Sequence, residues 1–264
     1  MYAFDYQRPA SVTDAKTAAS GDARYLAGGQ SLIQAMRLRL SQSERLVDLG
    51  GIADLKVIKV DASGVTVGAM ATHASVAANA DVRRAIPALA ELAGGIGDPM
   101  VRNMGTIGGS IANADPAACY PAAVLGLNAT VHTDRRTIAA DAFFTGLYET
   151  ALQPGELITA VSFPTPQKAA YEKYKQPASR FALIGVLVAQ TGGGVRVAVT
   201  GAKSHVFRAT QIEQALAKSF TPDAAKAVKM PTTDVNADLH GSAEYRAAMI
   251  SVIAARAVAA ALAR

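Results

Sequence analysis

Cysteine and tryptophan are almost absent from this sequence: Cys119 is the only cysteine, and there is no tryptophan. One thiol cannot form an internal disulfide, and it cannot supply the several thiolates that a zinc or iron–sulfur site needs. Any such cluster would therefore belong to another chain. Aromatic residues make up only 6% of the sequence, which fits poorly with stacking on nucleic-acid bases.

Long apolar runs and blocks of one charge are also missing. No stretch reaches the roughly 18 consecutive apolar residues of a membrane span. The N-terminus carries Asp5 where a secretory signal has basic residues, so we predict a cytoplasmic protein. The net charge of +5 comes from 26 basic and 21 acidic residues that are interspersed. Without a basic run interleaved with aromatics, this charge does not indicate nucleic-acid binding.

What remains is the composition of a compact protein, with 264 residues of which half are apolar and 18% are charged. This length suits one large domain or two modest ones. The breaker Pro164-Thr165-Pro166 follows a strand pattern, and we place a domain boundary there. The first domain is then 1–165, with subdomains of about 1–52 and 53–165, and the second is 166–264.

The hydrophobic periodicity predicts a mixture of helices and strands. Helical spacing covers residues 12–20, 32–40, 85–93 and 116–127, and β-rich runs cover 24–27, 46–49, 56–60, 65–70, 130–133, 136–139, 157–163, 181–190 and 195–201. Asp115 is the expected N-cap of the helix over 116–127, with Pro116 at the first helical position. The alanine-rich stretch 243–262 predicts a packing helix capped by Ser242.

A polar stretch, Met230 to Gly241, precedes that last helix and contains Asp234, Asp238 and His240. Its spacing resembles a cation-binding loop, but it lacks the glycine and terminal glutamate of an EF-hand. We interpret it as a solvated linker.

Two glycine-rich segments carry the clearest chemical signal: Ala27 to Ser31 (A-G-G-Q-S) and Gly105 to Ser110 (G-T-I-G-G-S). Only glycine lets several backbone N–H groups approach one anion closely, so both segments are candidate diphosphate cradles. The predicted helix over 32–40 would point its N-terminal end at the same anion. The region Gly94 to Gly109 holds six glycines, and we expect a functional loop there.

Neither segment is a Rossmann fingerprint or a nucleotide-hydrolase P-loop. Each one alone could simply form a tight turn. Taken together, and well separated along the chain, they favour a cofactor held between two subdomains.

These segments belong to four blocks that resemble the FAD-binding medium subunit of the xanthine dehydrogenase and carbon monoxide dehydrogenase family. The blocks are A-G-G-Q-S, V-R-N-M-G-T-I-G-G-S-I-A-N-A-D-P-A-A, P-G-E-L-I-T-A-V-S-F-P and Y-E-K-Y-K-Q-P-A-S-R, in this order along nearly the whole chain. The resemblance implies an α+β, vanillyl-alcohol-oxidase-type (PCMH-type) FAD-binding fold. It consists of two α+β subdomains followed by a C-terminal domain with a three-stranded sheet and a helical bundle.

The resemblance also implies which residues hold FAD non-covalently. They are Ala27, Gly28, Gly29, Gln30, Ser31, Leu32, Ile96, Thr106, Ile107, Gly108, Gly109, Ser110, Asn113, Asp115, Cys119, Ile158 and Lys175. At Cys119 the family often has an acidic residue near the adenosine or ribose, and a thiol is a weaker acceptor than a carboxylate. A buried structural cysteine is the alternative interpretation. We interpret His73 as a structural histidine near a helix start.

The activity implied by the resemblance is electron transfer within a molybdenum hydroxylase. A large molybdopterin subunit oxidises the substrate, a small subunit with two [2Fe–2S] clusters passes electrons singly, and FAD on this chain delivers them to an acceptor, in a dimer of heterotrimers. The sequence contains no metal site or acid–base constellation of its own. Two alternatives remain: a self-sufficient flavin oxidase or reductase of the same fold, and a scaffold that has lost the flavin.

Overall fold

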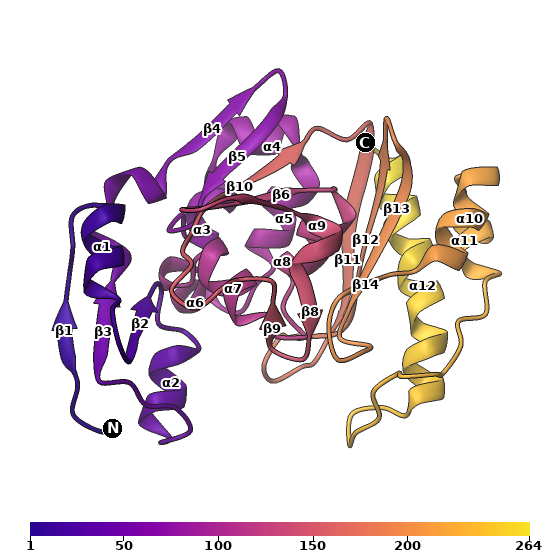
Figure 1. Cartoon of the computed structure of the whole chain (residues 1–264). Coiled ribbons are helices and arrows are strands. Elements are labelled where there is room, and N and C mark those ends of the chain that lie inside the picture. Colours follow the sequence, from indigo (N-terminus) through magenta and orange to yellow (C-terminus); the bar gives the residue numbers. More distant parts are fainter.

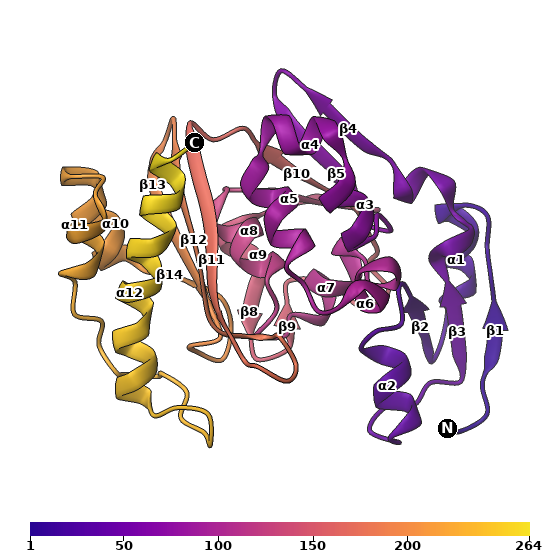
Figure 2. The ribbon, with the colours of Figure 1, turned by 180° about the vertical axis from the view of Figure 1, so that it is seen from behind.

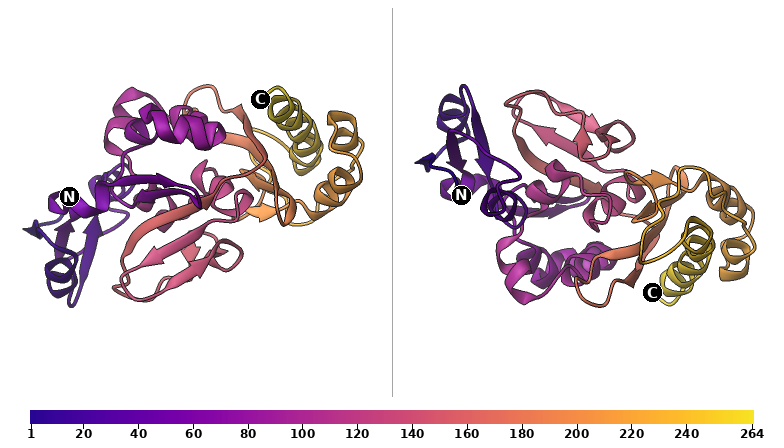
Figure 3. Two further views of the ribbon diagram at one scale, coloured as in Figure 1. Left: turned by 90° about the horizontal axis from the view of Figure 1, so that it is seen from above. Right: turned by 90° about the horizontal axis from the view of Figure 1, so that it is seen from below.

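A computed structural model describes residues 1–264 as three blocks in a row, seen from opposite sides in Figure 1 and Figure 2. Viewed from above and below, the N-terminal block lies at one end and the C-terminal block at the other (Figure 3). Helices and sheets occur in each block, so the predicted α+β architecture is confirmed.

The N-terminal block is a parallel sheet of order β1-β3-β2 with two short helices. Its elements are β1 (Asp5–Gln7), α1 (Val12–Ala18), β2 (Ala23–Leu26), α2 (Leu32–Arg37) and β3 (Arg45–Asp48), followed by the 3-10 turns η1 (Leu49–Gly51) and η2 (Ala53–Lys56). The predicted helix over 32–40 is therefore shorter than expected. Its core is a small cluster of seven buried apolar residues, of which five belong to this block and two, Met70 and Leu157, to the central block.

The central block is an antiparallel sheet of order β4-β5-β10-β6-β7, with helices packed on it. Its strands are β4 (Ile58–Asp61), β5 (Gly64–Gly68), β6 (Thr130–Thr133), β7 (Thr137–Ala139) and β10 (Ile158–Pro164), with a small hairpin of β8 (Phe144–Gly146) and β9 (Glu149–Thr150). Its helices are α3 (His73–Ala78), α4 (Ala80–Ala85), α5 (Pro87–Gly94), α6 (Pro99–Met104), α7 (Ile107–Asn113), α8 (Tyr120–Gly126) and α9 (Ala140–Phe143).

The C-terminal block is an antiparallel sheet of order β11-β12-β13-β14 covered by three helices. The strands are β11 (Lys168–Lys175), β12 (Ala182–Thr191), β13 (Gly194–Thr200) and β14 (Phe207–Arg208), and the helices are α10 (Thr210–Lys218), α11 (Pro222–Lys226) and α12 (Ala243–Leu262). The resemblance implied three strands. The fourth, β14, is a two-residue strand that pairs with the end of β13.

Two local predictions were wrong. The helix expected over 116–127 begins only at Tyr120, because the carboxylate of Asp115 accepts a bond from the amide of Ala117 (2.8 Å) and closes a turn instead of capping the helix. The expected loop from Gly94 to Gly109 contains α6 and the start of α7, whose caps are the side chains of Asp98 and Thr106.

The largest hydrophobic core, of 34 buried residues, runs from the central sheet through α5 and α8 to the near face of β12 and β13. A second core of 16 buried residues fills the other face of that sheet, under α10, α11 and α12. The sheet of the C-terminal block is thus buried on both sides. The domain boundary at residue 165 stays a prediction, and the core of 34 residues contains side chains from both sides of it.

The final helix, α12, has the bounds and the Ser242 cap that the sequence predicted. It is also the one helix that is long and apolar enough to cross a membrane. This is weak evidence for a membrane span, because half of the apolar stretch is buried inside the protein. One face of it packs against β11 and β12. In the preceding polar stretch, Asp238 is paired with Arg246 of this helix (2.7 Å).

Candidate cofactor site

A cavity of about 720 Å³ opens where the three blocks meet. Its walls come from the β2–α2 loop of the N-terminal block, from the segments around α6, α7 and residues 152–158 of the central block, and from the loop between β11 and β12. Its size is typical of a small-molecule site, and its lining joins segments far apart in the sequence.

Fifteen of the seventeen residues predicted to hold the cofactor line this cavity. They are Ala27, Gly28, Gly29, Gln30, Ser31, Leu32, Ile96, Thr106, Gly108, Gly109, Ser110, Asn113, Asp115, Cys119 and Ile158. The other two do not. Ile107 is fully buried in the large core, and Lys175 is exposed at the end of β11. Lys173, two residues earlier, lines the cavity instead.

The two glycine-rich segments lie directly against each other. A Cβ atom built on Gly28 would fall 2.0 Å from the carbonyl oxygen of Met104, so any side chain at this position would force the segments apart. Gly109 of the second segment is near Ala27 of the first, and a Cβ atom on Gly109 would lie 3.3 Å from the Cβ of Ala27. This contact between backbones places both segments on one wall of the cavity.

The first segment presents unused hydrogen-bond donors to the cavity. The backbone N–H groups of the four consecutive residues from Gly28 to Ser31 donate to no acceptor in the protein, and Gly29 has a left-handed backbone with φ of 71°. Successive free N–H groups around such a residue form a concave site for an anion. Helix α2 has only six residues, so the amides contribute more to this site than a helix dipole does.

The second segment is built differently from what its sequence suggested. The amides of Ile107 and Gly108 donate to Ala71 and Ala69, and the amide of Gly109 donates to the Thr106 side chain at 3.1 Å. With these donors used inside the protein, the segment contributes close packing and the side chains of Ser110 and Asn113 to the cavity, and it is not a second anion cradle.

His73 lies at the start of α3, as predicted, but it also lines the cavity. Its side chain is buried, and burial together with the nearby charge of Arg102 lowers the pKa of His73 from 6.5 to about 4. The imidazole is therefore neutral near pH 7. Its Nδ1 atom has no hydrogen-bond partner in the protein.

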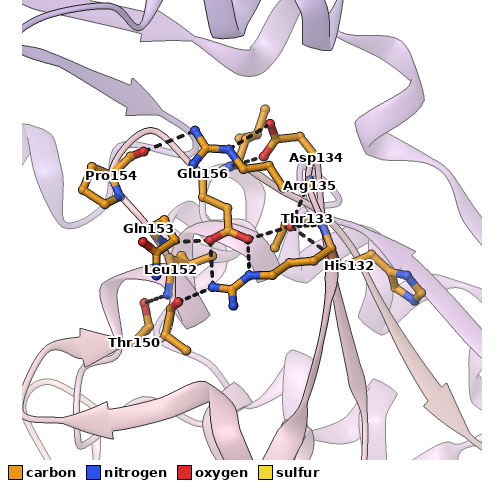
Figure 4. Close-up of polar contacts among 12 residues, drawn as sticks. His132, Thr133, Asp134, Arg135, Thr150, Leu152, Gln153, Pro154 and Glu156 are labelled. Carbon is orange, nitrogen blue, oxygen red and sulfur yellow. Dashed lines mark hydrogen bonds and ion pairs between the residues drawn. The ribbon is translucent and has the colours of Figure 1, made fainter.

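The wall formed by residues 152–158 is held in place by Glu156. Its buried carboxylate accepts bonds from Arg136 (2.9 and 3.1 Å), from the Thr133 hydroxyl (2.8 Å) and from the amide of Gln153 (2.7 Å). Figure 4 shows the labelled members of this network converging on the carboxylate. The bonds from Arg136, followed by those from Gln153 and Thr133, lower the pKa of Glu156 from 4.5 to about 2. This anchor was not recognised from the sequence.

Two contacts connect the N-terminal block to the central block near the same wall. The hydroxyl of Tyr25 donates to the carbonyl of Gly155 (3.2 Å), and the ammonium of Lys16 pairs with Asp134 (2.9 Å). The block that carries the free amides is thereby fixed to the central block.

Residues 2–166 match the family described as the FAD binding domain in molybdopterin dehydrogenase. The chain belongs to this family. It is 35% identical to the carbon monoxide dehydrogenase medium chain of Hydrogenophaga pseudoflava, over 99% of this chain and 98% of that one. It is 34% identical to the nicotine 6-hydroxylase medium subunit of Paenarthrobacter nicotinovorans, over 97% and 96% of the two chains.

The fold of this family member agrees with solved structures. The reconstituted CO dehydrogenase from Oligotropha carboxidovorans contains a chain that superimposes with a TM-score of 0.89 at 35% identity, covering 100% of this chain and 99% of that one. The predicted fold and family are therefore confirmed, and the chain is the FAD-binding component of an oxidoreductase.

The residues of the cavity fit FAD. Four free amides suit the negative charge of a diphosphate. Apolar side chains such as Leu32, Ile96 and Ile158 suit the flat ring systems. The cavity volume of about 720 Å³ lies in the range of sites that enclose ligands of this kind.

Proposed function

We propose that the chain binds FAD non-covalently in this cavity and transfers electrons within a molybdenum hydroxylase. The observation that carries the proposal is the run of four unused N–H groups from Gly28 to Ser31 on the cavity wall. The amides of Gly28 and Gly29 are partly buried and would be costly to leave without an acceptor, and an anionic group can accept from all four amides.

Each part of the cavity has a separate task in this proposal. The amides from Gly28 to Ser31 hold the diphosphate, and the hydroxyl of Ser110 and the side chain of Asn113 add polar contacts. The neutral imidazole of His73 offers a hydrogen-bonding group without adding charge. The carboxylate of Glu156 is ionised and accepts hydrogen bonds from Arg136 and from the wall itself. It is therefore not available as a proton donor.

FAD, when bound, exchanges one or two electrons, which suits a junction between single-electron carriers and a two-electron reaction. We propose that a small subunit with [2Fe–2S] clusters delivers electrons to this site and that a large molybdopterin subunit oxidises the substrate. Similarity to medium chains of multi-subunit dehydrogenases supports this division of labour. A cytoplasmic dimer of heterotrimers is the assembly we propose.

Two measurements test the proposal. The purified chain, mixed with FAD and freed of excess, should retain about one flavin per chain in its absorption spectrum. Coexpressed with an iron–sulfur chain and a molybdopterin chain from the same genome, it should copurify with both, and its flavin should be reduced when substrate is added without oxygen. A colourless protein without affinity for FAD would refute the proposal and favour a scaffold.

A self-sufficient flavin oxidase is distinguished by turnover. The chain alone, loaded with FAD, should not oxidise the substrates of the assembled complex. Substrate-dependent flavin reduction in the isolated chain would replace the electron-transfer proposal with that alternative.

A further inference from the structure

Lys173 lines the cavity and makes three hydrogen bonds, each to a different segment of the chain that borders the cavity. Its ammonium donates to the carbonyl of Gly95 (2.8 Å), to the sulfur of Cys119 (3.3 Å) and to the carbonyl of Arg180 (3.0 Å). A lysine ammonium has three donors and no acceptor. All of its hydrogen-bonding capacity is therefore used on the protein.

The three acceptors belong to three different segments. Gly95 follows α5, Cys119 precedes α8, and Arg180 lies in the loop between β11 and β12. The carbonyls of Gly95 and Arg180 accept no other hydrogen bond from the protein. Loss of the ammonium would leave the partly buried Gly95 carbonyl unpaired, and it would release the exposed Arg180 carbonyl and its loop from α5.

Lys173 lies near the end of β11, where it is paired with Gly185 of β12. Tyr171, two residues earlier on the same side of β11, has its hydroxyl close to Gly185 as well. The pairing shifts register between Tyr174 and Lys175, so the next lysine along the strand leaves this alignment and is exposed.

From this geometry we infer that Lys173 is a positioning residue through which the C-terminal block sets the shape of the flavin cavity. It holds three segments that border the cavity at a fixed spacing and does not itself serve as a ligand. The inference rests on the proposed FAD site, but it concerns protein groups that are in place without a cofactor.

The test compares Lys173→Met with Lys173→Arg and with Lys168→Met. Methionine keeps the length and removes the donors, arginine keeps the donors with a different shape, and Lys168 lies on the same strand outside the cavity lining. Circular dichroism and thermal unfolding first establish that each variant is folded.

Two readouts separate positioning from general stability. In Lys173→Met the dissociation constant of FAD should rise about tenfold or more, the effect of losing hydrogen bonds from a charged donor, while Lys173→Arg should recover part of the affinity. The second readout is the rate at which a thiol reagent labels Cys119, the only cysteine in the chain. Loss of the neighbouring ammonium disfavours the reactive thiolate and by itself slows labelling. Labelling of Lys173→Met without FAD that is at least tenfold faster than in wild type would therefore report opening of the site, and Lys168→Met should match wild type.

The outcomes decide separately on the inference and on the proposed function. If wild type binds FAD and folded Lys173→Met binds it equally well and labels equally slowly, Lys173 is not a positioning residue. If wild type binds no FAD, the proposed function fails, and labelling of the FAD-free proteins alone decides on Lys173. Loss of affinity in Lys168→Met to the same degree would also overturn the inference.

Discussion

At the scale of single residues, Gly28 and Gly29 are neighbours with different tasks. Gly28 makes room for the carbonyl oxygen of Met104, whereas Gly29 supplies a left-handed turn whose Cβ position lies 3.0 Å from a side-chain atom of Ile33 and not in the cavity. A side chain on Gly28 separates two segments of backbone. One on Gly29 strains only the turn that presents the free amides.

We predict that Gly29→Ala weakens FAD binding about tenfold and lowers the free energy of unfolding by only about 1 kcal/mol. Gly28→Ala should lose both FAD binding and several times as much stability, because the clash is with backbone. Flavin titration and urea unfolding of the two variants measure both quantities. Wild-type affinity in Gly29→Ala would show that the turn is not part of the site.

His73 should give the protein a characteristic pH dependence. Its pKa is about 4 in the folded chain and 6.5 as an isolated side chain, so the unfolded state binds more protons between these values. The free energy of unfolding should therefore fall as the pH is lowered from 6.5 to 4. Glu156, whose pKa is lowered to about 2, contributes stability that is lost only below its usual 4.5.

We predict that His73→Phe has a flatter stability profile than wild type between pH 6.5 and 4, because the substitution removes the titrating group. Urea unfolding at several pH values in this window gives the slope. The exposed His240, changed to Gln, is the matched control and should keep the wild-type slope. Identical slopes in all three proteins would assign the acid sensitivity to other groups.

At the scale of elements, Arg246 is a buried side chain that connects α12 to the rest of the C-terminal block. It donates to the carbonyls of Leu183 and Gly201 (3.0 and 2.9 Å) and to both carboxylate oxygens of Asp238. The polar stretch that resembled a cation loop thus supplies a partner for an arginine.

We predict that Arg246→Met lowers the free energy of unfolding by about 3 kcal/mol, because it leaves two carbonyls and a carboxylate without their donor. Arg256, on the same helix, is exposed, and Arg256→Met should change stability by less than about 0.5 kcal/mol. Chemical unfolding followed by circular dichroism measures both. Equal effects of the two substitutions would mean that the buried bonds contribute little.

The elements also show where sequence patterns were sufficient. Strand β6 and helix α12 have the predicted bounds, because their apolar periodicity agrees with their burial. Strand β11 was not predicted, because Glu172, Lys173 and Lys175 in its second half break the apolar pattern of a strand. The six glycines from Gly94 to Gly109 suggested a loop, yet side-chain caps and tertiary packing stabilise two short helices there.

In the candidate site, too, sequence patterns predicted only part of the structure. The glycine pattern located both segments, but the family resemblance could not tell which lysine of β11 reaches the cavity. Lys173 and Lys175 are two residues apart and would lie on one face of a regular strand. The register shift after Tyr174 turns the second one away, and no residue pattern announces such a shift.

At the scale of the whole molecule, the three blocks differ in the size of their hydrophobic cores. The core of the N-terminal block has only seven buried apolar residues, two of them from the central block, against 34 in the core that joins the other two blocks. The N-terminal block is therefore expected to open most readily. FAD, bound between it and the central block, would link the weakest part of the molecule to the strongest.

We predict that FAD slows hydrogen exchange in β1, β2 and β3 and leaves the amides of β12 and β13 unchanged. At a concentration of one hundred times its dissociation constant, a ligand adds about 2.7 kcal/mol to the free energy of any opening that releases it. Exchange measured by mass spectrometry with and without FAD gives the comparison. Uniform protection of all sheets would mean that the protein opens only as one unit.

The contact of Gly28 with the Met104 carbonyl bears on how the holoprotein matures. Because protein backbone packs against Gly28, we predict that the donors are arranged by the chain itself and that little conformational entropy is lost when FAD binds. We therefore expect that FAD can be incorporated after the chain has folded.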